Sequence, residues 1–173
     1  MSDEDVMEDF ILERGENRKK ILDVGCGDGK LLIKLAERNK SSELYCVDLH
    51  AEYARSNIER DGYSHRIKCI TAKAEDIPLE DRSFDLIFCL RSLHEFSDPV
   101  KSLQEIKRML APDGEAIIID WRREAETGVR EKYYGKREIR EFMEKAEYDT
   151  NNIKIKEVNR FNIVLYIQDT RGE

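Results

Sequence analysis

The chain has 173 residues, which is enough for one domain with a buried core and short for two. Its 30 basic and 37 acidic residues give a formal net charge of −7 at pH 7, which opposes nonspecific attraction to nucleic-acid phosphates. No run is apolar enough to span a bilayer, and the acidic start over residues 1–5 is unlike a secretion signal. We therefore expect a single-domain cytoplasmic protein whose partners include neither nucleic acid nor a membrane.

The first predicted element is a short helix within residues 1–16. Met7, Phe10 and Ile11 fall on one helical face with acids on the other, and Gly15 closes the helix. We expect this helix to cover the edge of a sheet or the mouth of a binding site.

A strand, a glycine-rich turn and a helix follow over residues 20–36. Ile21, Leu22 and Val24 predict a strand that is buried on both faces. Apolar residues over 31–36 repeat at helical spacing, so the turn directs the positive end of a helix at the crevice. Three glycines in the turn permit close backbone approaches that a Cβ would forbid, namely Gly25, Gly27 and Gly29.

Strands and helices then alternate through the rest of the chain. Apolar runs predict strands that are followed by helices, with acids at two strand ends, Asp48 and Asp120. Asp98-Pro99 predicts the start of one helix, and Ala111-Pro112-Asp113-Gly114 its end. The remaining expected elements are helices around 51–58 and 139–146 and strands at 44–47, 67–71, 84–90, 116–119, 153–158 and 163–167.

This order predicts an α/β fold with a doubly wound, mostly parallel seven-stranded sheet and helices on both faces. The last two strands, joined tightly at Asn159-Arg160, predict a C-terminal antiparallel hairpin. In such sheets a ligand lies beyond the carboxyl ends of the strands at the switch point, here beside Gly25 and Gly27.

Four motifs in this order resemble the class I S-adenosylmethionine-dependent methyltransferases, of the type 11 kind. ILDVGCGDG over 21–29 and YCVDLH over 45–50 are similar to the first two motifs of that family. AEDIPL over 74–79, leading into SFDLI, and EIKRMLAPDG over 105–114 are similar to the next two. The last has Asp113 in place of the first glycine of the family turn R-x-L-x-P-G-G. The resemblance covers about residues 20–121 and implies S-adenosylmethionine as the cofactor.

The resemblance assigns the two ends of the cofactor to different acids. It implies that Asp48 binds the adenosyl ribose and Leu49 packs on the adenine; the alternative for Asp48 is an acid that caps the helix starting near His50, a role the same residue could also fill. It implies that Asp23 orients the methionine end while Gly25, Cys26 and Gly27 present backbone to it. The alternative for Asp23 is a structural acid that satisfies the turn amides.

Adenine recognition departs from the family pattern, because Lys73 stands where many relatives have an acid before Ala74. A lysine cannot accept a hydrogen bond from the adenine amino group. Either Glu75 or the backbone around Lys73 and Ala74 accepts it, or adenine recognition is weaker here. Glu75 could also be a solvated acid at the start of a helix.

By the resemblance, the stretch Leu90-Arg91-Ser92-Leu93-His94-Glu95 lies where the family places residues beside the transferring methyl group. His94 is a candidate general base, or else a histidine that only packs a helix. NAD is the competing cofactor, but it requires G-x-G-x-x-G, and the carboxylate of Asp28 would repel a pyrophosphate.

The four cysteines are widely separated in the sequence, and no two of them form a C-x-x-C motif. We therefore expect free thiols and no metal site. The basic residues over 122–140 indicate either an anionic or aromatic acceptor or, with four glutamates among them, a solvated surface. The resemblance divides the chain into a helical cover (1–16), a cofactor-binding core (17–121) and a C-terminal helix and hairpin on the substrate side (122–173).

The function expected from these observations is in-line methyl transfer to a small-molecule acceptor. The alternatives are a non-catalytic subunit that binds S-adenosylmethionine, or a methylase of protein or nucleic acid that needs a partner. The oligomeric state, monomer or homodimer, is open.

Overall fold

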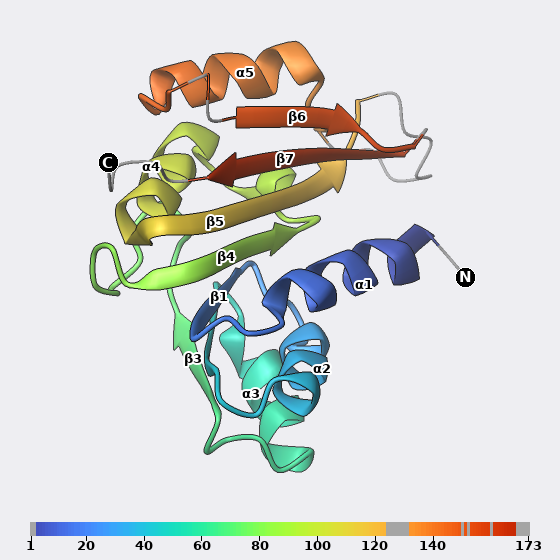
Figure 1. Cartoon of the computed structure of the whole chain (residues 1–173), viewed down its shortest axis with the longest axis vertical. Coiled ribbons are helices and arrows are strands. Elements are labelled where there is room, and N and C mark those ends of the chain that lie inside the picture. The colour runs from blue at the N-terminus through green and yellow to red at the C-terminus, as the bar shows by residue number, and fades with distance from the viewer. Residues whose placement is uncertain (1–2, 124–131, 150, 152, 160, 169–173) are drawn as a thin grey trace.

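The computed structural model describes residues 3–123, 132–149, 151, 153–159 and 161–168 (Figure 1). Its helices are α1 (Asp3–Gly15), α2 (Lys30–Arg38), α3 (Ala51–Arg60), a single 3₁₀ turn η1 (Leu93–Glu95), α4 (Pro99–Met109) and α5 (Lys136–Lys145). Its strands are β1 (Lys20–Val24), β2 (Glu43–Asp48), β3 (Ile67–Thr71), β4 (Phe84–Leu90), β5 (Leu110–Trp121), β6 (Ile153–Glu157) and β7 (Asn162–Gln168).

The seven strands form one sheet in the order β3-β2-β1-β4-β5-β7-β6. The first five strands in this order, β3, β2, β1, β4 and β5, are parallel to one another. The strand β7 runs antiparallel to both β5 and β6. The predicted doubly wound sheet and the terminal hairpin are confirmed. The strand order reverses between β1 and β4, so the switch point lies at the carboxyl end of β1.

Helices cover both faces of the sheet (Figure 1). Ile11 of α1, Leu32 of α2 and Ile58 of α3 are buried in one hydrophobic core. Ile106 of α4 and Met143 of α5 are buried in the other. The N-terminal end of α1 lies at the same edge as the arrowheads of β4 and β5, which is the edge where the switch point opens (Figure 1).

The ends of α4 follow from local chemistry. The carboxylate of Asp98 accepts a hydrogen bond from the Lys101 amide at 3.1 Å, and Pro99 occupies the first helical position, as predicted. After the helix, Asp113 has a φ of +61°. Asp tolerates this left-handed conformation better than most residues, which explains how it replaces a glycine in the family turn.

The prediction of four free thiols is wrong for one pair, because Cys46 and Cys69 form a disulfide. The two residues are register partners on neighbouring strands β2 and β3, with their Cα atoms 4.7 Å apart. Cys26 and Cys89 are free and buried. The spacing of the cysteines in the sequence does not reveal this disulfide, because the register of the two strands is what brings residues 23 positions apart side by side.

The connection between β6 and β7 is organised by Asn159, whose side-chain oxygen accepts hydrogen bonds from the amides of Phe161 and Asn162, both at 2.8 Å. Arg160, the second residue of the predicted tight turn, lies outside the described residues. Within the described part of the chain, no helix has the length and apolar character needed to cross a bilayer.

Candidate functional site

Two glycines of the turn after β1, Gly25 and Gly27, have different surroundings. Gly25 has a φ of +80°, and a Cβ there would lie 2.5 Å from the Cβ of Ser92. The Ser92 hydroxyl also donates a hydrogen bond to the Gly25 carbonyl at 2.9 Å, which ties the turn to the end of β4. Gly27 has a φ of +54°, but a Cβ there would meet nothing within 4 Å. A ligand can therefore approach the backbone at Gly27, while Gly25 is needed for packing.

Asp48 at the end of β2 is held by two backbone amides. Its Oδ2 accepts from the Gly27 amide at 2.9 Å, and its Oδ1 accepts from the His50 amide at 2.8 Å. The second bond lies just before α3, whose N-cap is His50 and has no side-chain cap hydrogen bond, so Asp48 does not cap the helix as the alternative role required. Because an ionised carboxylate has about four acceptor positions, Asp48 can bind two more donors without losing these contacts.

Two adjoining cavities flank this carboxylate. The first has a volume of about 240 Å³ and the second about 420 Å³, a combined size within the range of small-molecule sites. Both are lined by Gly25, Asp48, Ser92 and Glu95. The first adds Val24, Val47, Leu49, His50, Ala72, Ala74, Glu75, Phe96 and Ser97, and the second adds Glu8, Asp23, Cys26, Gly27, Asp28, Lys30, Leu31, Lys34, Leu90 and Arg91.

Asp23 lies inside β1, is only 3% exposed as a residue, and lines the second cavity. Its Oδ1 has no hydrogen-bond partner among the described residues. Burial raises the pKa of Asp23 well above its ordinary value, and the charges of Asp48 and Asp28 raise it further. A buried acceptor without a donor is costly, so a cationic ligand group in this cavity would be bound strongly.

Two ion pairs lie among the residues that line the second cavity. Lys30 lies 2.6 Å from Asp28, and Lys34 pairs with Glu8 of α1. Partial burial opposes ionisation of Asp28, but the hydrogen bonds and charge of Lys30 outweigh it and lower the pKa of Asp28. Burial, followed by the nearby Asp23 and Asp48, raises the pKa of the Cys26 thiol, so this cysteine stays protonated and is no nucleophile.

The structure brings together all the residues predicted to bind cofactor except one. Lys73 is exposed and lies outside the lining of both cavities, and its carbonyl accepts a hydrogen bond from the Asp76 amide at 3.2 Å. Glu75 lines the first cavity, while its Oε1 accepts from the Asp98 amide at 2.9 Å. Glu75 is therefore tied to the start of α4 rather than being only a solvated acid.

His94 lies in η1 and is not among the residues that line the two cavities. Its side chain is 4% exposed, and its Nδ1 lies 2.6 Å from Oδ1 of Asp120. The Tyr133 ring packs edge-on against the imidazole, with centroids 5.1 Å apart. Sequence reasoning placed Asp120 at the end of β5 but did not connect it to His94. It also placed Ser92 in the stretch after the fourth strand but did not connect its hydroxyl to Gly25.

Some of the described basic residues after β5 pair with acids. Arg122 lies 3.3 Å from Glu157, and Arg123 pairs with Glu138. Tyr133 and Tyr134 of the same segment are buried. Residues 124–131, including Arg130, lie outside the described residues. The pairs that are described favour the solvated-surface interpretation of this segment.

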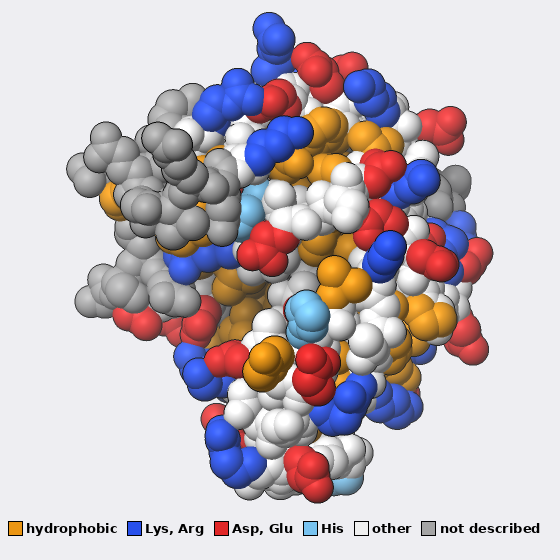
Figure 2. All heavy atoms as spheres, turned by 180° about the vertical axis from the view of Figure 1, so that it is seen from behind, with side chains coloured by type: hydrophobic (Ala, Val, Ile, Leu, Met, Phe, Trp, Pro, Cys, Tyr) orange, Lys and Arg blue, Asp and Glu red, His pale blue; other side chains and the backbone are white. Residues whose placement is uncertain are grey.

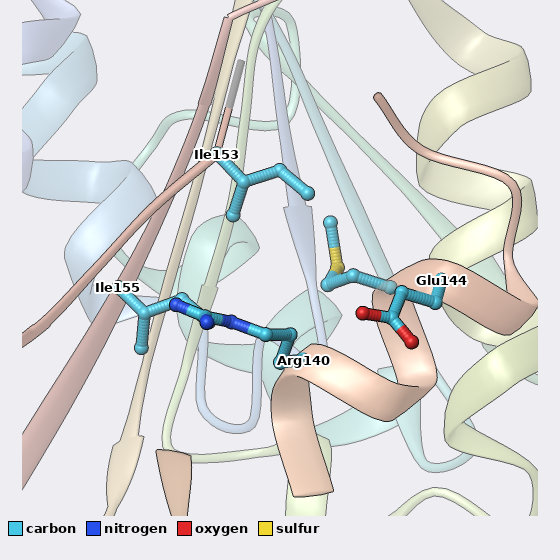
Figure 3. A pocket seen from close by; sticks show the side chains of 5 residues that line it. Arg140, Glu144, Ile153 and Ile155 are labelled. Atoms are coloured by element: carbon cyan, nitrogen blue, oxygen red, sulfur yellow. The ribbon is translucent and has the colours of Figure 1, made fainter. Parts of the chain in front are cut away.

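A separate hollow of about 260 Å³ lies between α5 and β6. Figure 3 shows Arg140 and Glu144 projecting from α5, with Ile153 and Ile155 coming from β6. It shares no lining residue with the two cavities at the switch point. No predicted site residue reaches it.

A doubly wound sheet with a glycine turn and two cavities at its switch point defines a class of ligand-binding α/β proteins. Residues 22–118, more than half of the chain, match the methyltransferase domain family. The chain therefore belongs to that family. It has the Rossmann-like fold of the S-adenosylmethionine-dependent methyltransferases, and the family and its structures indicate S-adenosylmethionine as the cofactor.

Individual relatives share part of the sequence or most of the fold. The chain is 34% identical over 106 residues to the 2-phytyl-1,4-naphtoquinone methyltransferase of Trichormus variabilis, covering 59% of this chain and 46% of that protein. It is 34% identical over 105 residues to the malonyl-[acyl-carrier protein] O-methyltransferase of Geobacter sulfurreducens, covering 61% and 39%. Thus the chain covers less than half the length of both. A solved S-adenosylmethionine-dependent methyltransferase from Aquifex aeolicus superimposes with a TM-score of 0.75 and 25% identity, covering 93% of this chain and 88% of that one.

Proposed function

We propose that this protein is an S-adenosylmethionine-dependent methyltransferase that acts on a small-molecule acceptor. The observation that carries the proposal is the buried, unsatisfied Oδ1 of Asp23 beside an open glycine turn. S-adenosylmethionine carries an ammonium group, and that group would satisfy this oxygen. The chemistry of the donors and acceptors therefore fits the cofactor that the family indicates.

The cofactor would span both cavities. Asp48 would accept hydrogen bonds from the ribose hydroxyls with the acceptor positions that the Gly27 and His50 amides leave open. Leu49 and Ala74 would contact the adenine in the first cavity, and Glu75 or the nearby backbone would accept from its amino group. Asp23 and the backbone of residues 25–27 would hold the methionine end in the second cavity.

When bound, S-adenosylmethionine supplies an electrophilic methyl group on a sulfur that is already an activated leaving group. The protein's main contribution is then geometric, because holding donor and acceptor in line removes much of the entropic barrier. Leu90 and Arg91, which line the second cavity, would border the acceptor.

A small acceptor fits the charge of the chain and the names of two relatives. The net charge of −7 disfavours nucleic acid, and Figure 2 shows acidic and basic side chains interspersed over one face rather than a basic patch. One relative is named for a naphthoquinone and the other for malonyl-[acyl-carrier protein]. Both names are compatible with methyl transfer to a small chemical group.

The test combines binding with turnover. Calorimetry should show S-adenosylhomocysteine binding to the isolated chain, and a screen with methyl-labelled S-adenosylmethionine should show transfer to acceptors with hydroxyl, carboxyl or amino groups. No binding would refute the proposed cofactor site. Binding without transfer to any acceptor, restored by a copurifying protein, would instead support the subunit or partner-dependent alternatives.

A further inference from the structure

A groove between α1 and the outer strands β6 and β7 lies apart from the switch point. Its volume is about 510 Å³, which is larger than either cavity beside Asp48 and within the range of small-molecule sites. It shares no described lining residue with those two cavities. We propose that this groove binds a single-chain anionic amphiphile, an alkyl chain that ends in a carboxylate. Such binding requires neither the cofactor nor the methyl acceptor of the proposed function.

Strand alternation places two lysines in the groove. The strand β6 has the sequence Ile-Lys-Ile-Lys-Glu, and its isoleucines pack against the hydrophobic core on the α5 side of the sheet. Lys154 and Lys156 therefore project from the opposite face, where they line the groove. Their register partners on β7, Tyr166 and Val164, line the groove as well. Each positive charge thus stands next to an apolar or aromatic side chain.

The helix α1 forms the other wall of the groove. Val6, Phe10 and Arg14 recur every four residues, so they share one face of the helix, and all three line the groove. Residues 6 and 14 are eight positions apart, which gives this wall a length of about 12 Å. Val6 is 38% exposed and Val158, which follows β6 and lines the same groove, is 49% exposed. An alkyl chain in the groove would remove this apolar surface from water.

The charge of the groove is opposite to that of the molecule. The described lining residues include three cations and no acid, although the whole chain has a net charge of −7. Arg14 is compensated, because its guanidinium lies 3.1 Å from Glu115 and donates to the Tyr166 hydroxyl at 2.5 Å. Lys154 and Lys156 are exposed, and neither is paired with an acid among the described residues. The two lysines therefore complement an anionic head group.

Two simpler explanations account for less of this arrangement. Lysines on an edge strand such as β6 deter pairing with other chains, but that role requires neither a cavity nor exposed valines beside it. A second copy of the chain, docked by the same face about a twofold axis, would bring the lysines of both copies together. Repulsion between like charges disfavours that contact.

Decanoate is a suitable probe, and calorimetry should show that it binds whether or not S-adenosylhomocysteine is present. Each methylene removed from the probe should weaken binding about fourfold. Decyltrimethylammonium, which has the same alkyl chain and the opposite charge, should bind at least about tenfold more weakly. Methyl NMR should show shifts at Val6, Val158 and Val164, and none at Val24 and Val47, which line the first cavity.

A pair of double variants tests the lysines. Lys154→Gln/Lys156→Gln should weaken decanoate binding at least about tenfold, because charge-assisted hydrogen bonds to the carboxylate are lost. The matched control Lys40→Gln/Lys136→Gln removes two lysines outside the groove and should bind as the wild type does. All four positions are exposed, so both variants should fold.

Four results would overturn the proposal: no binding of decanoate, equal binding of the two probes, displacement of decanoate by S-adenosylhomocysteine, or equal affinity of the two double variants. Binding to vesicles of anionic lipid without binding of monomeric decanoate would instead assign the groove to a membrane surface. Dimerisation of the free protein that excludes decanoate would assign it to a second copy. Because decanoate binding is measured without cofactor, its failure is distinct from a failure of the proposed methyltransferase function.

Discussion

Two acids at the carboxyl end of the sheet have opposite surroundings. Asp48 is oriented by amides on either side and faces open space, whereas Asp23 is buried with an oxygen that nothing in the described chain satisfies. The first has acceptor positions left for neutral hydroxyls, and the second lacks a donor, which a ligand ammonium group would supply. Their difference fixes the direction in which a ligand with a ribose and an ammonium group would lie.

Replacing Asp48 tests the ribose contact. Asp48→Ala should weaken S-adenosylhomocysteine binding by about 10–100-fold, since hydrogen bonds to a charged group contribute about 1.5–3 kcal/mol. Calorimetry measures the change. Asp61→Ala, which removes an exposed acid paired with Arg60 outside both cavities, is the matched control and should bind as the wild type does. Equal affinity of Asp48→Ala and wild type would remove the ribose assignment.

Asp23 makes binding depend on pH. Its pKa in the empty folded protein is raised, so below that pKa the carboxyl is neutral and cannot pair with a cation. The affinity for S-adenosylhomocysteine should therefore rise with pH, by up to about tenfold per pH unit, and level off above the raised pKa. Asp23→Asn should bind at least about tenfold more weakly at high pH and should lack this slope.

The same shift has a consequence for stability. A raised folded-state pKa means that Asp23 destabilises the empty protein as the pH rises from the unfolded-state value to the folded-state value. At neutral pH, the free energy of unfolding of Asp23→Asn should accordingly exceed that of the wild type by at least about 1 kcal/mol, as measured by chemical denaturation. This gain in stability should disappear near pH 4. A neutral-pH loss of stability would contradict the assignment.

At the scale of elements, Arg108 of α4 connects the helix to the wall of the first cavity. Its guanidinium donates to the carbonyls of Ile77 and Leu79 at 2.8 and 2.7 Å and pairs with Asp81 and Glu105. Hydrogen bonding to Glu105 raises the pKa of Arg108, which stays charged. The arginine of the family turn thus fastens the segment that contains Ala74 and Glu75.

Arg108→Lys should lower the free energy of unfolding by about 2 kcal/mol, because a lysine ammonium cannot reproduce the planar fork of donors. The affinity for S-adenosylhomocysteine should fall as well, since the cavity wall loses its attachment. Chemical denaturation and calorimetry measure the two effects. Arg60→Lys, at an exposed arginine that pairs with its neighbour Asp61, should leave both unchanged. A variant of Arg108 with wild-type stability would show that the contacts do not matter.

The features that sequence predicted well are local in the chain. Buried runs, the glycines after β1 and the cap at Asp98 depend on neighbouring residues, so periodicity and turn chemistry reveal them. The Asp120–His94 pair joins residues 26 positions apart, and the Ser92–Gly25 contact joins residues 67 apart. The Cys46–Cys69 disulfide likewise depends on strand register. Tertiary contacts of this kind require the sheet to be assembled before they can be seen.

For the whole molecule, ligand binding should couple to folding. S-adenosylhomocysteine at 100 times its dissociation constant should stabilise the protein by about 2.7 kcal/mol. For a chain of this size, that corresponds to a rise in Tm of about 5–10 °C. NAD at the same concentration should give no shift, because Asp28 and Asp23 would repel its pyrophosphate. A thermal scan with both ligands separates the methyltransferase from an oxidoreductase on the same fold.

The position of β7 has a consequence for synthesis on the ribosome. β7 is made last among the described strands, yet it lies between β5 and β6. Until residues 162–168 emerge, a nascent chain exposes one flank of β5, including Ile117, Ile118 and Ile119, without a neighbour. Such a strand flank attracts other chains, so we expect translation arrested before residue 162 to yield aggregates or chaperone-bound protein.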